Sequence, residues 1–377
     1  MKIAVTADLH LQEKRVHEQA PVLDAIVGEI TRARPDLIVV AGACCGWSVP
    51  HVASIVERNL LLEFLVALGS IAPVHVVRGN HDAQGDHDWI SHLRTIHPVR
   101  WYAAPDLHVE KDRPSHVLVA LPWMDRSAFG PEEDWREATL KAWRVVLDRA
   151  RSHAPKRVIV VAHAALKGAV LIEGQPPVPV HDPTFAVRDL LPDMDVPMVL
   201  IAGHYHVPQA VGVLGAYPGS PFVHTFGDKG KRGWMLVDLP DEGSPVFLWK
   251  PIAQPARIAI DYLAATDEIV QPENPVEPVK GDHVRIVASF HDRDSVTAMD
   301  NVRDFERELT ERGCLVEVRC EIQRARRERE GAEAVAGDSP LGDRLRAYAA
   351  TCQDPPGDDV VNRAVERVTR WSEGDGT

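Results

Sequence analysis

Two short pairs of metal-binding residue types each stand directly after an apolar run of this chain. The first pair is Asp8 and His10, and the second is His204 and His206. Residues two apart project to the same side of an extended backbone, so both members of a pair can face one cleft. A carboxylate together with imidazoles suits Mn, Fe, Zn or a related divalent ion. Each pair alone is a weak signal, because the same spacing occurs in ordinary turns.

The segment Gly79-Asn80-His81-Asp82 adds a second kind of chemistry. The glycine allows a sharp turn after the apolar run 73–77. Asn80 offers a neutral oxygen ligand, and His81 offers a proton donor that titrates near neutral pH. Phosphoester cleavage needs a metal ligand beside an acid, although a turn with an incidental histidine would look the same.

These residues need a framework of strands, and the apolar periodicity provides one. The predicted strands are 2–7, 36–41, 73–77, 116–120, 157–162 and 198–202, and the predicted helices are 22–34, 52–68 and 132–151. Strand, helix and strand joined by short connections indicate an α/β fold with parallel pairing. The candidate ligands, which now include His163, all follow predicted strands. We therefore expect them to converge at one edge of one sheet.

Taken together, the candidates are six oxygen and nitrogen donors: Asp8, His10, Asn80, His163, His204 and His206. Six donors are too many for one tetrahedral zinc ion. They suit two ions about 3.5–4 Å apart, an arrangement that clamps a phosphoryl group and activates a water molecule.

Length, charge and cysteine content limit the kind of protein. The chain has 377 residues, a formal net charge of −13 and five cysteines. The irregular cysteine spacing and the absence of a leader-like start predict a cytoplasmic protein. No apolar run approaches the roughly 20 residues of a membrane span, so no membrane association is expected. The acidic balance argues against a generally basic nucleic-acid surface, although metal ions and a local Arg patch could supply the charge that contacts DNA.

Changes in composition predict four regions. Residues 1–255 would form the main α/β domain, and the Pro-rich segment 256–280 would be a linker. Residues 281–330 contain two predicted strands and one helix and would form a small α+β domain. Residues 338–372 would form two short amphipathic helices that dock on another surface. The Arg residues within 324–329 favour a solvated face, because Glu residues neighbour them.

The order of the motifs resembles the calcineurin-like metallophosphoesterase superfamily. The shared pattern is Asp8-x-His10, Gly79-Asn80-His81-Asp82, His163 and Gly203-His204-x-His206. Three further segments are similar to the SbcD-type exonucleases of DNA double-strand-break repair: Leu121-Pro122-Trp123, His206-Val207-Pro208-Gln209 and Tyr217-Pro218-Gly219-Ser220-Pro221. The likeness covers the main domain in motif detail and the small domain more loosely. It implies a metallophosphoesterase four-layer α/β sandwich with a small α+β capping domain and C-terminal helices.

The resemblance implies a metal-dependent DNA exonuclease or endonuclease subunit of a repair complex, with Mn as the expected metal. One ion would be held by Asp8, His10 and His206, and the other by Asn80, His163 and His204. His81 would steady or protonate the leaving oxygen. The implied partners are DNA, contacted by the capping domain, and an SMC-like ATPase of the SbcC type, bound through the C-terminal helices. A homodimer is also common in that family.

One position departs from the family pattern. The family has Gly-Asp where this chain has Gly42-Ala43, and that Asp bridges both ions. Two divalent ions about 3.5 Å apart repel by about 20 kcal/mol at an effective dielectric of about 20, and Ala43 offers no compensating charge. Cys44 or Cys45 could substitute as a thiolate, but neither occupies the family position. The additional His of the family is also replaced, by Gly46.

Three explanations remain open for Ala43. The chain could be an engineered inactive variant of a nuclease, a natural protein with one weakened or missing ion, or a DNA-binding or ATPase-binding subunit that kept only the fold. The six remaining ligands favour a nuclease scaffold with impaired activity. The alternative enzyme is a small-molecule phosphodiesterase of the same superfamily, against which the extra C-terminal domain counts.

Overall fold

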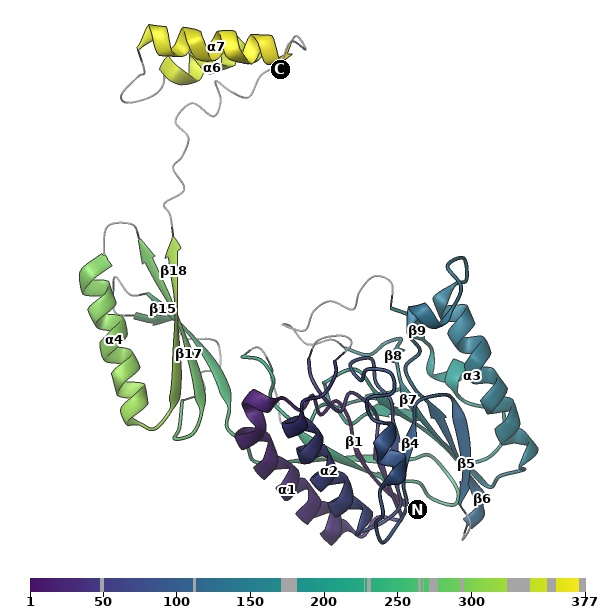
Figure 1. Ribbon diagram of the computed structural model, residues 1–377. Coiled ribbons are helices and arrows are strands. Elements are labelled where there is room, and N and C mark those ends of the chain that lie inside the picture. The colour runs from purple at the N-terminus through teal and green to yellow at the C-terminus, as the bar shows by residue number, and fades with distance from the viewer. Residues whose placement is uncertain are drawn as a thin grey trace. The chain divides into compact units, whose positions relative to one another are not determined.

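The computed structural model describes the following residues: 1–47, 51–110, 113–170, 182–226, 228, 232–263, 266, 268–270, 277–291, 295–323, 340–350 and 357–372. The chain divides into two compact units (Figure 1). The first comprises residues 1–259 and 278–284, and the second comprises residues 260–277 and 285–377. Part of the expected linker, 271–276, and the segment 324–339 with its Arg residues lie outside the described residues.

The first unit contains two six-stranded sheets. The first sheet has the order β14-β13-β1-β2-β3-β4. Its strands are β1 (Lys2–Thr6), β2 (Leu37–Val40), β3 (Val74–Val77), β4 (Val99–Tyr102), β13 (Gly233–Asp238) and β14 (Val246–Pro251). Strands β1 to β4 pair in parallel, whereas β13 is antiparallel to both β1 and β14. The carboxyl ends of β1, β2 and β3 therefore meet at one edge.

The second sheet has the order β11-β12-β10-β7-β6-β5. Its strands are β5 (Asp106–Glu110), β6 (Arg113–Leu121), β7 (Arg157–His163), β10 (Met198–Gly203), β11 (Gln209–Val211) and β12 (Gly215–Tyr217). Strands β6, β7, β10 and β12 pair in parallel, so their carboxyl ends also share one edge. Two further strands, β8 (Ala165–Leu166) and β9 (Thr184–Phe185), form a separate short pair.

The two sheets pack face to face, and helices cover their outer faces (Figure 1). Helices α1 (Val16–Ala33) and α2 (Ile55–Gly69) cover the first sheet, and α3 (Trp135–Ser152) covers the second. Alternate residues of one strand enter different cores: Ile3 packs between the sheets, whereas Ala4 packs beneath the helices. Strands buried on both faces read as continuous apolar runs, which is why the sequence revealed them. The predicted four-layer α/β sandwich is confirmed.

Local capping explains where α2 and α3 begin. Ser54 and Glu57 form a capping box at α2: the Ser54 hydroxyl accepts from the Glu57 N–H, and the Glu57 carboxylate accepts from the Ser54 N–H. Asp134 caps α3 by accepting from the Glu137 N–H at 2.8 Å. The described part of the unit also contains the short 3-10 helices η1 (Glu13–Arg15), η2 (Asp88–His92), η3 (Arg126–Ala128) and η4 (Val187–Leu190).

The second unit contains most of a four-stranded sheet with the order β16-β15-β17-β18. The strands are β15 (Arg257–Leu263), β16 (Glu268–Val270), β17 (His283–His291) and β18 (Leu315–Gln323), and α4 (Ser295–Glu311) packs on them. Strands β15 and β16 lie inside segment 256–280, so these parts of the segment differ from the linker that the sequence predicts. The high proline content of the segment hid a short alternating pattern of apolar residues. In the folded chain Tyr262 is buried and stacks on Phe305 of α4, with ring centroids 5.2 Å apart.

Two further helices lie against each other near the end of the chain: α6 (Leu341–Ala350) and α7 (Asp358–Ser372). The sequence predicts helices over both segments. Arg346 donates to the Asn362 side chain at 3.4 Å. No described helix is both long enough and apolar enough to cross a membrane.

Candidate metal centre

The metal-binding residue types gather where the carboxyl ends of the two sheets meet. Asp8 follows β1 and Asn80 follows β3 in the first sheet, whereas His163 ends β7 and His204 follows β10 in the second. Direct contacts join the two groups: the His204 N–H donates to Asp8, and His163 lies against Asn80. The expectation of a single sheet edge is therefore wrong in this detail. Strand and helix periodicity is the same whether successive strands enter one sheet or two, so the sequence could not tell them apart.

The first donor set consists of Asp8, His10 and His206. One ligand atom from each lies within 4.8 Å of the others, and all three side chains are buried. Nδ1 of His10 donates to the carbonyl oxygen of Gly46 at 2.7 Å, because a carbonyl can only accept. This bond leaves a lone pair on Nε2, which lies 3.0 Å from Nε2 of His206. The three residues fit one divalent ion, with the tautomer of His10 already fixed by its neighbour.

Burial sets the protonation of this first set. It raises the pKa of Asp8 to about 8, although the N–H of His204 donates to both carboxylate oxygens at 3.0 Å. Burial, followed by the nearby charge of Arg232, lowers the pKa of His206 to about 3. Burial and the neighbouring His206 hold the pKa of His10 well below its usual range. At pH 7 the imidazoles are neutral and able to bind a metal, whereas Asp8 must first lose a proton.

The second donor set consists of Asn80, His163 and His204. Nδ1 of His163 donates to the carbonyl oxygen of Ala41 at 2.8 Å, and Nε2 faces Oδ1 of Asn80 at 2.8 Å. Burial lowers the pKa of His163 to about 4, so the ring is neutral and Nε2 carries a lone pair. Two lone pairs at this distance repel each other, and a cation bound by both atoms removes the repulsion. The ring of His204 lies 5.5 Å from that of His163.

Ala43 lies between the loops that carry the two sets. Its carbonyl oxygen accepts from the His10 N–H at 2.9 Å, and a Cβ atom on Gly79 would lie 2.1 Å from its nitrogen. The side chain is fully buried. The backbone of Ala43 therefore contacts both loops, and its methyl side chain offers no ligand atom.

The two cysteines after Ala43 are poor substitutes for a bridging carboxylate. Cys44 and Cys45 belong to the apolar core beneath the helices. Burial raises the pKa of both thiols well above their usual range, and the charge of Asp82 adds to this effect. A thiol without an accessible thiolate form binds a hard divalent ion weakly. The structure argues against the thiolate substitution that the sequence left open.

Asp82 ends the predicted Gly-Asn-His-Asp segment, but the sequence assigned it no role. Its carboxylate accepts from the N–H groups of Cys44 and Gly79, each at 2.8 Å, and lies 3.3 Å from Nε2 of the buried His87. Burial alone would raise the pKa of Asp82, but the hydrogen bond and charge of His87 lower it below its usual value. This carboxylate therefore joins the loop of Ala43 to the loop of Asn80.

Ser220 and His224 support Asp8 from behind. The Ser220 hydroxyl donates to the carbonyl oxygen of Asp8 at 2.7 Å, so Nε2 of His224, at 2.7 Å, must donate to that hydroxyl. Nδ1 of His224 then accepts from Arg15 at 3.2 Å. Both ring nitrogens are used, so His224 is a supporting residue and not a ligand. Ser220 belongs to a segment that the sequence analysis singled out, whereas His224 has no spacing that would reveal it.

Aromatic side chains surround the imidazoles. Trp123 stacks on His204, with ring centroids 5.3 Å apart and an angle of 23°. The ring centroid of Trp47 lies 4.8 Å from that of His10, and Trp47 is partly exposed. His81 is also partly exposed and meets the ring of His10 edge-on at 4.6 Å. His81 therefore lies beside the first donor set.

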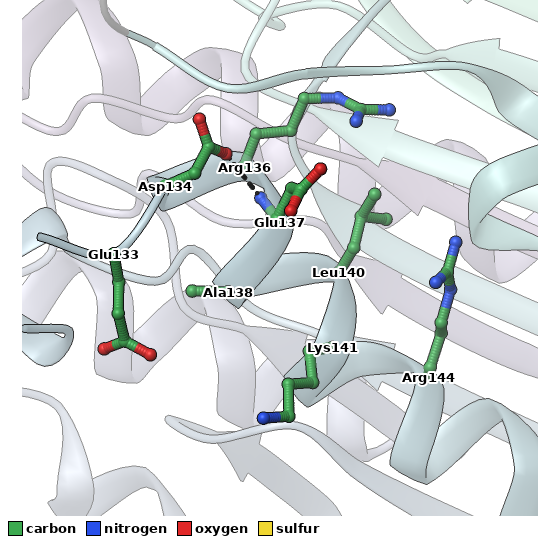
Figure 2. A pocket seen from close by; sticks show the side chains of 8 residues that line it. All are labelled: Glu133, Asp134, Arg136, Glu137, Ala138, Leu140, Lys141 and Arg144. Atoms are coloured by element: carbon green, nitrogen blue, oxygen red, sulfur yellow. Dashed lines mark hydrogen bonds between the residues drawn. The ribbon is translucent and has the colours of Figure 1, made fainter.

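A separate hollow of about 480 Å³ lies along the outer side of α3 (Figure 2). Its lining includes Glu133, Arg136, Lys141 and Arg144, and the dashed line in Figure 2 marks the capping bond of Asp134. None of its lining residues belongs to either donor set. Charges of both signs line it, so it lacks the character of a site for one charged ligand.

Comparisons with known proteins agree with this geometry. The family profile described as calcineurin-like phosphoesterase matches residues 1–208. The chain is 22% identical over 267 residues to the SbcD component of the SbcCD nuclease from Staphylococcus saprophyticus subsp. saprophyticus, covering 64% of this chain and 66% of that protein. The chain therefore matches just under two thirds of the length of this relative.

Solved structures give more distant similarities. The phosphoesterase YfcE from E. coli is 15% identical, with a TM-score of 0.31, and the match covers 66% of this chain and 98% of that one. A dimetal phosphatase from Danio rerio is 14% identical, with a TM-score of 0.38, and the match covers 63% and 92%.

Proposed function

Because this chain belongs to the calcineurin-like phosphoesterase family, as its motifs predict, we propose that it is a metal-dependent DNA nuclease acting within a repair complex. In this proposal it hydrolyses phosphodiester bonds at DNA ends or within strands, with two divalent ions and Mn as the metal. The similarity to the SbcD component of an SbcCD nuclease supports the choice of DNA over other phosphodiesters.

One observation carries the proposal: each of the two sets of three donors combines residues from both sheets, and hydrogen bonds orient one imidazole in each set. His10 and His163 each use Nδ1 to donate to a backbone carbonyl, so each presents Nε2 to its set. A neutral imidazole buried without a ligand loses hydration on both nitrogens, and a bound ion compensates for that loss. Two such sets side by side suit a phosphoryl group held between two ions.

The chain's own residues would divide the work as follows. Bound ions would polarise the phosphoryl group and supply an activated water molecule. Asp8 and His204 are tied together by hydrogen bonds, so a shift of either loop would move both donor sets. Trp123 keeps the ring of His204 in place by stacking. His81, partly exposed beside His10, would give a proton to the leaving oxygen.

The partners belong to the same proposal. The second unit, with its sheet and α4, would contact DNA, and α6 and α7 would bind an SMC-like ATPase of the SbcC type. Val360 and Val361 open the apolar side of α7, and Val360 is 48% exposed. We also expect the protein to form a homodimer and to act in the cytoplasm.

Ala43 favours a second candidate function. Without a bridging carboxylate the fold could serve as a non-catalytic protein that binds DNA or the ATPase. Association with DNA would then be unaffected by a chelator, because no step would need the ions. A small-molecule phosphodiesterase is the remaining alternative, and it would cleave a generic diester faster than DNA ends.

The test compares the natural chain with Ala43→Asp and Ala43→Asn in the presence of Mn²⁺. We expect slow, chelator-sensitive cleavage of duplex DNA ends by the natural chain and a rise of at least about tenfold in Ala43→Asp, because a restored charge stabilises the ion pair. Ala43→Asn matches the size of Asp without its charge and should stay slow. Equal rates in all three proteins would favour the non-catalytic function, and faster cleavage of bis(p-nitrophenyl) phosphate than of DNA would favour the small-molecule enzyme.

A further inference from the structure

The two donor sets differ in charge. The first set contains one carboxylate, Asp8, and is the single group of three His, Cys, Asp or Glu residues that could hold an ion among the residues the structure describes. The second set, Asn80, His163 and His204, contains an amide and two imidazoles. Neither an amide nor an imidazole bound to a metal through its lone pair carries a negative charge, so this set offers nothing to offset the charge of an ion.

Neither nearby carboxylate belongs to the second set. Both oxygens of Asp8 accept from the backbone N–H of His204, and Asp8 forms the compact group with His10. The carboxylate of Asp82 is turned toward the N–H groups of Cys44 and Gly79. The hydrogen bonds of both carboxylates are therefore made to groups outside the second set of donor atoms.

The residue between the sets adds no charge. Ala43 contributes a buried methyl group, and the two cysteines after it are packed in the apolar core beneath the helices. A divalent cation entering the second set would keep its full charge beside the fully buried His163, because none of the three donors is anionic. Buried charge is costly unless an opposite charge accompanies it, so a neutral donor set alone holds such an ion weakly.

A phosphate group carries the missing negative charge. We propose that the second set, Asn80, His163 and His204, takes up its ion only together with a phosphate group, whereas the first set binds an ion alone. This inference rests on the proposed function, since it assumes that both sets bind metal. In this chain the substrate phosphate would replace the charge that a residue at position 43 does not supply.

Linkage gives the inference a measurable form. If phosphate raises the affinity of the protein for the second ion by a given factor, the second ion must raise the affinity for phosphate by the same factor. The same coupling must weaken when a carboxylate is placed at position 43, because the second ion then no longer depends on phosphate for its charge. An amide at that position should leave the coupling intact.

The experiment counts Mn²⁺ bound to the full-length, metal-free protein at pH 7.5. Free Mn²⁺ is followed by its electron paramagnetic resonance signal, with and without millimolar inorganic phosphate, at ionic strength matched with chloride. We expect one tightly bound ion per chain without phosphate and two with it, the second at least tenfold tighter than without phosphate. A spin-coupled two-ion spectrum should appear only when phosphate is present.

Two variants complete the test. Ala43→Asp should bind two ions without phosphate, and Ala43→Asn should behave like the natural chain. Two ions in the natural chain without phosphate would overturn the inference and leave the proposed function intact. One ion in the natural chain under both conditions would overturn the inference alone. No bound ion under either condition would overturn the proposed function, and the inference with it.

Discussion

Asp8 is the residue whose protonation controls the first donor set. Its pKa is raised to about 8 by burial, so the ion-free protein carries a neutral carboxyl group there at pH 7. The other members of the set, His10 and His206, are already neutral. Ion binding at this set therefore releases the proton of Asp8 and no proton from the imidazoles.

Because Asp8 is protonated and the two imidazoles are neutral, we can predict how many protons are released when Mn²⁺ binds. We expect about one proton released for the first ion at pH 7, falling toward zero by about pH 9, where Asp8 is already ionised. Calorimetry of metal-free protein in buffers of different ionisation enthalpy measures this number. Affinity for the first ion should rise as pH increases through about 8. Proton release that persists above pH 9 would show that another group supplies the proton.

The backbone at position 43 suits an acidic side chain. Ala43 has a φ of 51°, in the left-handed region that Asp and Asn enter more readily than Ala. Asp8, with φ of 52°, and His10, with φ of 44°, share this conformation across the same loop pair. Ala43→Asp and Ala43→Asn are therefore compatible with the local backbone, which makes them a matched pair.

Among the secondary-structure elements, close approach between strand ends brings the two sheets together. A Cβ atom added to Gly203, at the end of β10, would lie 1.8 Å from the carbonyl oxygen of Ala41, which follows β2. That same carbonyl oxygen accepts from Nδ1 of His163. The absence of a side chain at Gly203 thus lets the second sheet place its histidine against the first.

Replacing Gly203 tests this packing. We expect Gly203→Ala to lower the unfolding free energy by about 3 kcal/mol, because the added methyl group would overlap backbone atoms that cannot move aside. The matched control is Gly28→Ala in α1, where the nearest atom is a flexible Arg32 nitrogen at 3.7 Å. This helix position should gain about 0.5–1 kcal/mol. Denaturant unfolding measures both, and a similar small change in the two variants would contradict the close approach.

The stability of the folded chain as a whole depends on pH, because the centre buries several neutral imidazoles. Burial lowers the pKa of His163 to about 4 and of His206 to about 3, and it holds those of His10, His204 and His224 well below the usual range. Between these values and about 6.5 the unfolded chain binds more protons than the folded one. The stability that these residues contribute is therefore present above about pH 6.5 and is lost as pH falls.

We expect the chelated protein to lose at least about 1–2 kcal/mol of unfolding free energy per pH unit between pH 6.5 and 5. Asp8 acts in the opposite direction, because its raised pKa favours the folded state at low pH. The effect of this one carboxyl group is smaller than the combined effect of the several imidazoles. Guanidinium unfolding at several pH values measures the slope. His206→Gln should reduce it by about 1 kcal/mol per pH unit, and a flat profile in the natural chain would contradict neutral burial.

Local patterns in the amino-acid sequence were enough to identify the central strands of both sheets, the long helices and the candidate ligand types. Continuous apolar runs revealed the core strands, and the donors stood directly after them. The sequence also revealed that position 43 lacks a carboxylate, because motif order fixes which residue follows Gly42. These features are local, so they can be read from neighbouring residues without knowledge of the fold.

The partners of each strand and the residues that support the ligands could be learned only from the folded chain. Pairing between distant strands is set by packing, and the apolar pattern along one strand does not identify the strand with which it pairs. The roles of Asp82, His224 and Trp47 depend on contacts between loops far apart in sequence, and β15 and β16 were masked by nearby prolines. Residue type already shows that Asn80, His163 and His204 include no carboxylate, whereas only the folded chain shows that Asp8 and Asp82 make their hydrogen bonds to other groups, because those contacts join loops far apart in sequence.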